Sequence, residues 1–216
     1  FCEVIAHDAG REILDEQDVI GVILSGGPNS VYDDDSPVAP TWVFEAGVPI
    51  LGICYGMQLL AHQLGGKVEP GTEREYGHAV VHKDGQDNIL FDGLDTEVPV
   101  WMSHGDRIEV LPPGFRSMAY TENSPLAVMG NEEGTMFGIQ FHPEVVHTPQ
   151  GAEILKNFVF GVCGAVGDWT PANFVSDTVA RIREQVGDGK VICALSGGGD
   201  STVAAALIHK AIGGRL

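Results

Sequence analysis

The sequence contains no long hydrophobic run and few basic residues. No apolar stretch reaches the roughly 18 residues that a transmembrane helix needs, so the sequence predicts no membrane span. Lysine and arginine total 12 against 30 aspartates and glutamates, which gives a net charge of −18. A surface this acidic excludes general binding to nucleic acid, because DNA and RNA are polyanions. It fits an ordinary acidic protein, which we favour, or one adapted to high salt, where self-repulsion is screened.

Cysteine is also scarce, and the N-terminus carries no targeting pattern. The four cysteines are scattered, without the paired spacing of zinc ligands or of a disulfide framework. We therefore expect free thiols, no metal site and a reducing, cytoplasmic location. The opening residues have neither the basic start nor the apolar core of a signal peptide. They begin without methionine and resemble the interior of a strand, so we expect a fragment or a processed chain.

The stretch Gly-Ile-Cys-Tyr-Gly-Met-Gln at 52–58 places a cysteine between two glycines. This spacing matches the nucleophile elbow, a strained strand-to-helix turn from which the nucleophile projects. Glycines let the strand and the helix approach closely, and the helix N-terminus is expected to favour the thiolate form of Cys54. The amide that follows Cys54 can stabilise an oxyanion. The alternative is a small buried hydrophobic residue, as free cysteines often are.

Apolar runs and turns predict an α/β domain with an antiparallel insertion. The runs at 18–24 and 48–53 are continuous, as in buried parallel strands. One helix is expected from Cys54 to Gly65–Gly66, and another over 150–160. The loops that follow the strands are where open α/β sheets place their sites. Further short β-like runs lie at 78–82, 98–102, 107–111, 117–120, 126–129 and 134–141.

A second unit is expected to start near residue 170, giving domains 1–169 and 170–216. Thr170 is suited to cap a helix and Pro171 to begin it. Valines and an isoleucine then recur at helical spacing. The apolar run at 190–195 predicts a buried strand, and the sequence Ser-Gly-Gly-Gly-Asp-Ser-Thr leads from it into another helix.

A cysteine nucleophile requires a base, usually a histidine, and that histidine requires an orienting partner. Among the eight histidines, His142 directly follows an apolar run, in the sequence Phe-His-Pro-Glu at 141–144. Glu144 lies on the same side of an extended segment, so it can hold the imidazole while His142 faces the thiol. The alternative for His142 is a purely structural histidine. Apart from His104, we give the other histidines a structural or surface role.

Two polar loops complete the candidate site. Ser-Gly-Gly-Pro at 25–28 follows a predicted strand and can point backbone amides into a site. Ser-His-Gly-Asp at 103–106 follows another, and its Asp106 can pair with a substrate ammonium group. An ordinary turn is the alternative for both loops.

These four motifs together resemble the class I (triad) glutamine amidotransferases. The stretches at 74–79 and 167–174 narrow the resemblance to the GMP synthase family, and residues 194–202 are similar to the phosphate loop of its ATP pyrophosphatase domain. The resemblance implies a flavodoxin-like, mostly parallel sheet with an antiparallel insertion. The first strand, loop and helix of a second α/β nucleotide-binding domain would follow. It also implies that the family's first strand and helix are missing ahead of Phe1.

The resemblance implies a role for each matching residue. Cys54 would attack the side-chain amide of glutamine, while His142 relays protons and Glu144 orients it. The amides of Gly27 and Tyr55 would form the oxyanion hole. The residues expected near the polar groups of the glutamine are Gln58, Ser103, His104 and Asp106.

In the GMP synthase family, the ammonia reacts with XMP that ATP has adenylylated, and GMP, AMP and pyrophosphate are formed with Mg²⁺. The resemblance therefore implies a ligase of purine biosynthesis with L-glutamine, XMP and ATP as substrates, while homodimerisation is left open. Since the chain ends soon after the phosphate loop, we expect it not to make GMP alone.

The phosphate loop also has a physical rationale of its own. Backbone amides at a helix N-terminus bind anions, and Ser201 and Thr202 can donate hydroxyl hydrogen bonds. Asp200 is expected to cap the helix or to orient the loop. Gly199 stands where the family usually has valine, which should make the loop more flexible. An ordinary flexible turn is the alternative. The expected ATP-binding residues are Ser196, Gly197, Gly198, Gly199, Asp200, Ser201 and Thr202.

Other functions stay open at this stage. The chain could belong to another class I amidotransferase that feeds a different synthase, although its phosphate loop argues against this. It could be a non-catalytic glutamine-binding module, although the intact set of Cys54, His142 and Glu144 argues against that. A standalone ATP pyrophosphatase is a third alternative, which the long first domain disfavours.

Overall fold

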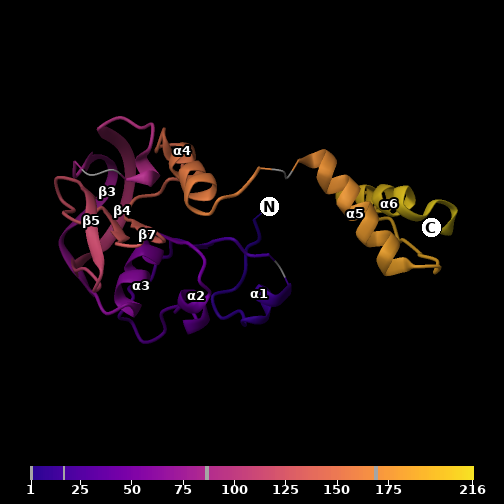
Figure 1. The fold of residues 1–216 in the computed structure, drawn as a ribbon, viewed down its shortest axis with the longest axis horizontal. Coiled ribbons are helices and arrows are strands. Elements are labelled where there is room, and N and C mark those ends of the chain that lie inside the picture. The colour runs from indigo at the N-terminus through magenta and orange to yellow at the C-terminus, as the bar shows by residue number, and fades with distance from the viewer. Residues whose placement is uncertain (1, 17, 86–87, 168–169) are drawn as a thin grey trace. The chain divides into compact units, whose positions relative to one another are not determined.

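The computed structural model describes residues 2–16, 18–85, 88–167 and 170–216 (Figure 1). It divides into two compact units, Glu3–Ala165 and Val166–Leu216. No helix in the described part of the chain is long and apolar enough to cross a membrane. The helices of the first unit are α1 (Glu12–Glu16), α2 (Thr41–Glu45), α3 (Tyr55–Gln63), η1 (Ile89–Phe91), α4 (Gly151–Lys156) and η2 (Asn157–Val162).

A seven-stranded mixed sheet forms the framework of the first unit, in the order β1-β2-β7-β6-β5-β3-β4. Neighbours among β1, β2 and β7 are parallel, and the other neighbours are antiparallel. The α/β fold with an antiparallel insertion is thus confirmed, although the parallel part is limited to three strands. The strands are β1 (Val22–Leu24), β2 (Ile50–Ile53), β3 (Lys67–Lys83), β4 (Glu97–Val110), β5 (Phe115–Tyr120), β6 (Val128–Asn131) and β7 (Met136–Ile139).

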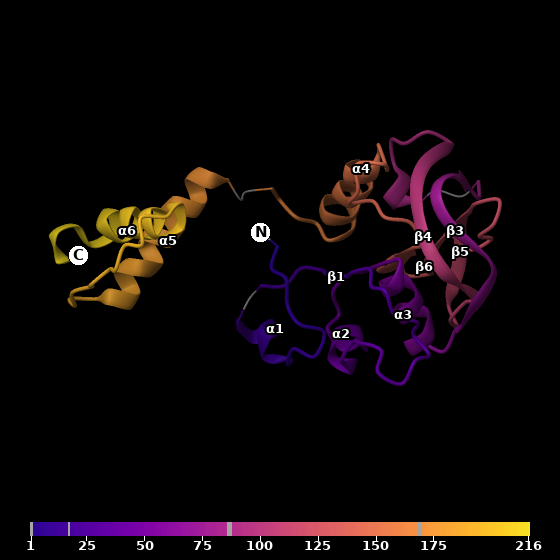
Figure 2. The same ribbon diagram turned by 180° about the vertical axis from the view of Figure 1, so that it is seen from behind.

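The antiparallel part is larger than the sequence suggested because β3 and β4 form one long, curved pair (Figure 2). The runs at 98–102 and 107–111, which the sequence predicts as separate strands, are both parts of β4. Irregular pairing between Pro70 and Glu75 marks a bulge in β3. A bulge increases the local twist and redirects side chains, and this one lies beside the candidate site.

The expected buried strand at 18–24 is only partly correct. Three residues form β1, and Ile20 and Ile23 are 50% and 40% exposed. In the described sheet β1 is an edge strand, so it pairs with β2 on one side and has no described strand on the other. By contrast, all four residues of β2 are buried, as its continuous apolar run predicts.

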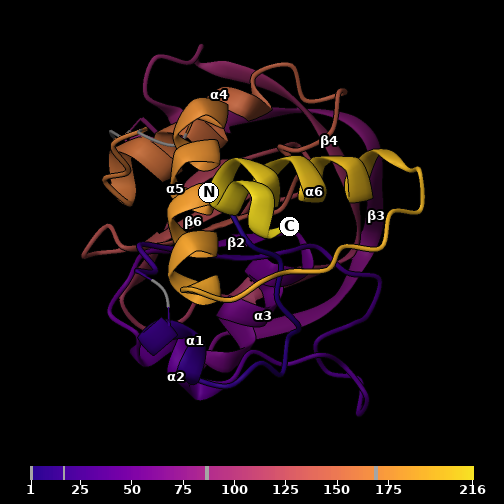
Figure 3. The same ribbon diagram turned by 90° about the vertical axis from the view of Figure 1, so that its right-hand side faces the viewer.

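Helices cover both faces of the parallel strands, with α3 on one side and α4 on the other (Figures 1 and 3). Successive residues of β2 point to opposite faces, so Ile50 packs in the cluster with α3 while Leu51 packs in the cluster with α4. The helix predicted over 150–160 forms as α4 and η2, with Ile154 and Phe158 buried in that second cluster. This packing fixes the positions of the carboxyl ends of the parallel strands, where the candidate site lies.

The second unit contains α5 (Pro171–Val186), α6 (Gly199–Ile212) and η3 (Gly213–Arg215). Thr170 caps α5 as predicted, since its side chain accepts a hydrogen bond from the amide of Asn173. The helices pack through an apolar stripe whose buried members are Val179, Ala211 and Ile212.

The strand predicted at 190–195 is wrong for this structure. No strand forms there, and Ile192 and Leu195 are 99% and 61% exposed. A strand needs a neighbour to satisfy its backbone groups, and none of the described strands lies in this unit. The apolar pattern of a strand is present at 190–195, but the described part of this unit contains no strand that could pair with it.

Candidate active site

The loops that follow β1, β2 and β7 meet beside β4 around a cavity of about 680 Å³. These are the carboxyl ends of the parallel strands, where open α/β sheets place their sites. Of the residues predicted from the sequence, those lining the cavity are Gly27, Cys54, Gln58, Ser103, His104, Asp106 and His142.

Cys54 occupies a strained turn between β2 and α3. Its φ of 50° is the only positive value for a non-glycine residue in the described chain. The two flanking glycines are required by space. A Cβ on Gly52 would lie 2.5 Å from the carbonyl oxygen of Gly56, and a Cβ on Gly56 would lie 2.0 Å from that of Leu24. The elbow predicted from the Gly-x-Cys-x-Gly spacing is therefore the geometry that the structure has.

Burial controls the ionisation of the Cys54 thiol. It raises the pKa from 9.0 to about 11, and the hydrogen bond from the Tyr55 backbone amide only partly opposes this. The negative charges of Glu144 and Asp106 raise the pKa further. The Sγ atom lies 3.6 Å from the carbonyl oxygen of Ser103, to which the thiol donates. Loss of solvation outweighs the effect of the helix N-terminus, so the expectation that this terminus would favour the thiolate is wrong.

His142 and Glu144 form a close pair, with 2.7 Å between Nδ1 and Oε1. The backbone of His142 is fixed as well, because its amide donates to the carbonyl of Trp101 at 3.1 Å. The hydroxyl of Thr148 donates to the carbonyl of His142 at 2.6 Å and accepts from the amide of Trp101 at 3.1 Å. Glu144 thus orients the imidazole, and Thr148, a residue that sequence reasoning missed, holds the backbone of His142.

Gly26 lies beside both the nucleophile and the base, and Gly27 lies against Tyr55. A Cβ on Gly26 would lie 3.1 Å from Cε1 of His142 and 3.8 Å from Cβ of Cys54, so both residues flank this glycine. A Cβ on Gly27 would lie 3.4 Å from Cγ of Tyr55. The structure therefore brings together Gly27 and Tyr55, the two residues predicted to supply the oxyanion hole.

Gln58 and Gln140 connect the nucleophile to β4. Nε2 of Gln58 donates to the carbonyl of Asp106 at 3.0 Å and to Oε1 of Gln140 at 3.1 Å. Nε2 of Gln140 in turn lies 3.8 Å from Sγ of Cys54. Gln140 was not predicted, although it precedes His142 by two residues and so shares its side of an extended segment.

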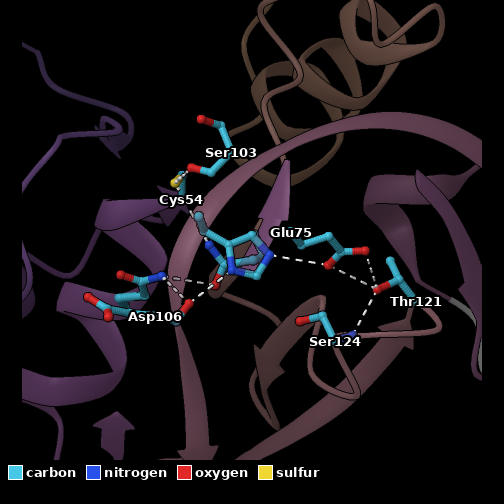
Figure 4. Close-up of polar contacts among 9 residues, drawn as sticks. Cys54, Glu75, Ser103, Asp106, Thr121 and Ser124 are labelled. Atoms are coloured by element: carbon cyan, nitrogen blue, oxygen red, sulfur yellow. Dashed lines mark hydrogen bonds and ion pairs between the residues drawn. The ribbon is translucent and has the colours of Figure 1, made fainter. Parts of the chain in front are cut away.

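The carboxylate of Asp106 is held by the loop that follows β1. Ser30 donates to Oδ2 at 2.5 Å, and Tyr32 donates to Oδ1 at 2.8 Å. Ser103, by contrast, faces the thiol with its backbone carbonyl (Figure 4). Both ring nitrogens of His104 are already engaged, one with the carbonyl of Asp106 and one with Glu75. This geometry favours a positioning role for His104 over the direct contact with glutamine that the resemblance implies.

The predicted phosphate loop lies in the second unit and is largely exposed. The residue that caps α6 is Gly198, and Asp200 lies within the first turn, so the predicted capping role of Asp200 is wrong. The hydroxyls of Ser201 and Thr202 both donate to the carbonyl of Gly198, at 3.0 and 2.9 Å. A Cβ on Gly199 would meet nothing within 4 Å, so this glycine is not required by space.

Comparison with known proteins gives consistent matches. The family described as "Glutamine amidotransferase class-I" matches residues 2–162. The chain is 56% identical to a GMP synthase [glutamine-hydrolyzing] from Dehalococcoides mccartyi and 54% identical to one from Thermomicrobium roseum. Each match covers all of this chain and 40% of the relative, so the chain spans about 40% of the length of these relatives.

Solved structures of similar proteins agree with this fold. A crystal structure described as that of a GMP synthase subunit from Thermoplasma acidophilum is 31% identical with a TM-score of 0.64, and the match covers 71% of this chain and 77% of that one. A glutamine amidotransferase from Methylobacillus flagellatus is 25% identical with a TM-score of 0.52, covering 63% and 55%.

Proposed function

The chain belongs to the class I glutamine amidotransferase family, and from that premise we propose that its cavity hydrolyses L-glutamine to L-glutamate and ammonia. One observation carries the proposal. Cys54 on a strained elbow, His142 and Gly27 line one cavity. Glu144 is paired with His142, and Tyr55 lies against Gly27. A nucleophile, an oriented base and nearby backbone donors are the parts that acyl transfer requires.

The high thiol pKa dictates the first step of the proposed mechanism. Because Cys54 is neutral below about pH 11, its proton must pass to His142 as sulfur attacks the amide carbon of glutamine. Glu144 stabilises the resulting imidazolium from 2.7 Å. The amides of Gly27 and Tyr55 donate to the oxyanion of the tetrahedral intermediate.

The second half of the reaction uses the same groups. His142 returns the proton to the amide nitrogen, the carbon–nitrogen bond breaks, and ammonia leaves a glutamyl thioester on Cys54. Water then attacks the thioester carbonyl while His142 accepts its proton. The carbon–sulfur bond breaks, glutamate leaves, and the proton returns to sulfur, so the enzyme is regenerated.

Charges around the cavity support an amino acid as the substrate. Arg74 and Asp106 both line the cavity, so it offers one positive and one negative side chain. The α-carboxylate and α-ammonium groups of glutamine are complementary to these charges. Gln58 and Ser103 add polar groups to the same walls. We propose that Arg74 and Asp106 orient the substrate so that its side-chain amide reaches Cys54.

For the whole protein we propose the reaction named by the D. mccartyi and T. roseum relatives. The ammonia would aminate XMP activated by ATP, and GMP, AMP and pyrophosphate would be formed. The exposed loop at 196–202 supports phosphate binding through its backbone amides at the start of α6. Mg²⁺ would bind the ATP phosphates in this reaction. Feeding a different synthase is the alternative.

The proposed glutaminase activity is tested by measuring glutamate and ammonia release from L-glutamine. Cys54→Ala is expected to abolish both. Cys163→Ala is the matched control, because burial also raises the pKa of Cys163 to about 11 while that residue does not line the cavity. Retained activity in Cys54→Ala, or equal loss in both variants, would refute the assignment.

A further inference from the structure

Glu75 and His104 form a buried polar pair beneath the cavity that the proposed reaction does not use. They lie opposite each other on β3 and β4, and their side chains are only 9% and 5% exposed. Oε2 of Glu75 is 3.3 Å from Nε2 of His104. Figure 4 shows Glu75 beside Thr121 and away from Cys54. Buried charged groups are costly unless paired, so this pair requires a reason.

The hydrogen-bond partners determine how many protons the pair carries. Nδ1 of His104 faces the carbonyl of Asp106 at 2.9 Å, and a carbonyl can only accept. Nε2 faces Glu75, whose two oxygens also face the hydroxyl of Thr121 at 3.1 and 3.3 Å. The oxygen of Thr121 already accepts from the amide of Ser124, which leaves its proton for Glu75. Nδ1 of His104 therefore acts as a donor, and one further proton lies between Nε2 of His104 and Oε2 of Glu75. With that proton on Nε2, both imidazole nitrogens donate and Glu75 is a carboxylate that accepts at both oxygens.

The far end of this network is the cavity wall. The carbonyl of Asp106 accepts from His104 and also from Nε2 of Gln58. Asp106 and Gln58 both line the cavity, and the carboxylate of Asp106 is held by Ser30 and Tyr32. A hydrogen bond from a charged donor is stronger than one from a neutral donor. An imidazolium at position 104 would thus fix the backbone that carries the Asp106 carboxylate.

We infer that Glu75 and His104 form a buried carboxylate–imidazolium pair that positions Asp106 and Gln58 for the amino-acid end of glutamine. The inference rests on the proposed glutaminase function. It makes His104 a positioning residue and adds Glu75 and Thr121, to which the sequence motifs assign no role. The pair is linked to Asp106 and Gln58 through the Asp106 carbonyl, so we expect it to act on substrate binding rather than on the chemistry at Cys54.

The test variant is Glu75→Gln in the full chain, because glutamine keeps the shape and can donate to Nε2 while removing the charge. We expect KM for glutamine to rise about fivefold, since a charge-assisted hydrogen bond becomes a neutral one. The kcat should stay within about twofold, as expected when uniform binding is lost. The opposite result, a loss of kcat with unchanged KM, would overturn the inference, and so would unchanged kinetics.

The chain offers a matched control on the same two strands. Glu97 and His82 also face each other across β3 and β4, with 3.7 Å between Oε1 and Nδ1, but this pair is largely exposed. Glu97→Gln should leave KM unchanged. At Thr121, Thr121→Ser should retain the wild-type KM because the hydroxyl is kept, while Thr121→Val should raise it. A rise in Thr121→Ser equal to that in Thr121→Val would indicate packing alone and contradict the inference.

A spectroscopic measurement separates this inference from the proposed function. The ¹⁵N signals of the His104 ring, identified by their absence in His104→Gln, should show two protonated nitrogens at neutral pH. In Glu75→Gln they should show one. An unprotonated nitrogen in the wild type would overturn the inference even if the chain hydrolyses glutamine. Absence of glutaminase activity with two protonated nitrogens would refute the proposed function and leave the ion pair standing.

Discussion

The two units each carry a glycine-rich turn that leads into a helix, yet these turns differ in how they are fixed. Around Cys54, a Cβ on Gly52 or Gly56 would collide with backbone atoms, and the turn is buried between β1, β2 and α3. Around Gly199 a Cβ would meet open space, and the loop is held by hydroxyl bonds to Gly198. The same residue type is thus required by close packing in one unit and only permits flexibility in the other.

The difference follows from what lies beneath each turn. The elbow is supported by a sheet with a hydrophobic cluster on each face, whereas the second unit buries only three apolar residues between α5 and α6. Packed interiors hold strained conformations such as the positive φ of Cys54, because surrounding contacts over-determine them. An exposed loop lacks that support, so its geometry depends on local hydrogen bonds.

The largest expected effect tests whether the proposed chemistry belongs to the first unit alone. His142→Ala should slow thioester formation by about 10²–10⁴-fold, because proton transfer by a positioned base contributes this much. Glu144→Gln should cost less, since orientation is only part of the effect. Rapid-quench measurement of the glutamyl thioester gives the rate. His209→Ala, on α6, is the control and should leave the rate unchanged, and a rate in His142→Ala equal to wild type would disprove the triad.

The contrast between the two turns can be tested directly by adding one methyl group to each. Gly56→Ala should destabilise the first unit by about 3 kcal/mol, because its Cβ would overlap the backbone of Leu24. Gly199→Ala should be neutral or stabilising by about 0.5 kcal/mol, since the unfolded chain loses entropy and nothing clashes. Urea unfolding of both variants measures the free energies. If Gly56→Ala and Gly199→Ala lowered the free energy of unfolding by similar amounts, the proposed difference between the two turns would be wrong.

The buried thiol should make the stability of the first unit depend on pH. The pKa of Cys54 is raised in the folded state, so its contribution to stability is present below about pH 9 and is lost as pH rises towards 11. The shift from 9.0 to about 11 corresponds to about 2–3 kcal/mol at the upper end. Cys54→Ser should therefore flatten the decline of the free energy of unfolding between these pH values.

The measurement is urea unfolding by fluorescence in a Trp169→Phe background, where Trp42 and Trp101 report on the first unit. Cys163→Ser is the comparison, and it should flatten the decline by a similar amount because burial raises the pKa of Cys163 to about 11 as well. An unchanged decline in Cys54→Ser would contradict the raised pKa.

The smallest expected effect concerns the second turn. In a protein that includes the remaining sequence of the relatives, Gly199→Val should tighten ATP binding by about 0.5–1 kcal/mol if loop entropy is the main term. In the 216-residue chain, binding should be millimolar or weaker, about −4 kcal/mol, since few contacts are available. Calorimetric titration with ATP and Mg²⁺ measures both. If Ser201→Ala leaves binding by the longer protein unchanged, the phosphate-loop interpretation fails.

The sequence predicts the parts of the site that depend on short-range spacing. The elbow around Cys54 and the pair of His142 with Glu144 each occupy a few consecutive residues, so their local geometry follows from strand and helix periods. It could not predict Gln140 beside Cys54, or Glu75 beside His104, because these contacts join residues 86 and 29 positions apart. The strand predicted at 190–195 is wrong because an apolar run indicates only a preference for strand structure. It does not show whether a neighbouring strand is present to pair with it.

What the sequence determined by itself was therefore the inventory: a strained cysteine turn, a histidine with its carboxylate, glycine-rich loops and an acidic surface. Tertiary structure decided which of these groups act together and in what state. Burial raised the pKa of Cys54 against the preference of the helix N-terminus. Pairing of β3 with β4 brought Glu75 to Nε2 of His104. Solvation and long-range contacts depend on where the whole chain packs, and no local spacing encodes them.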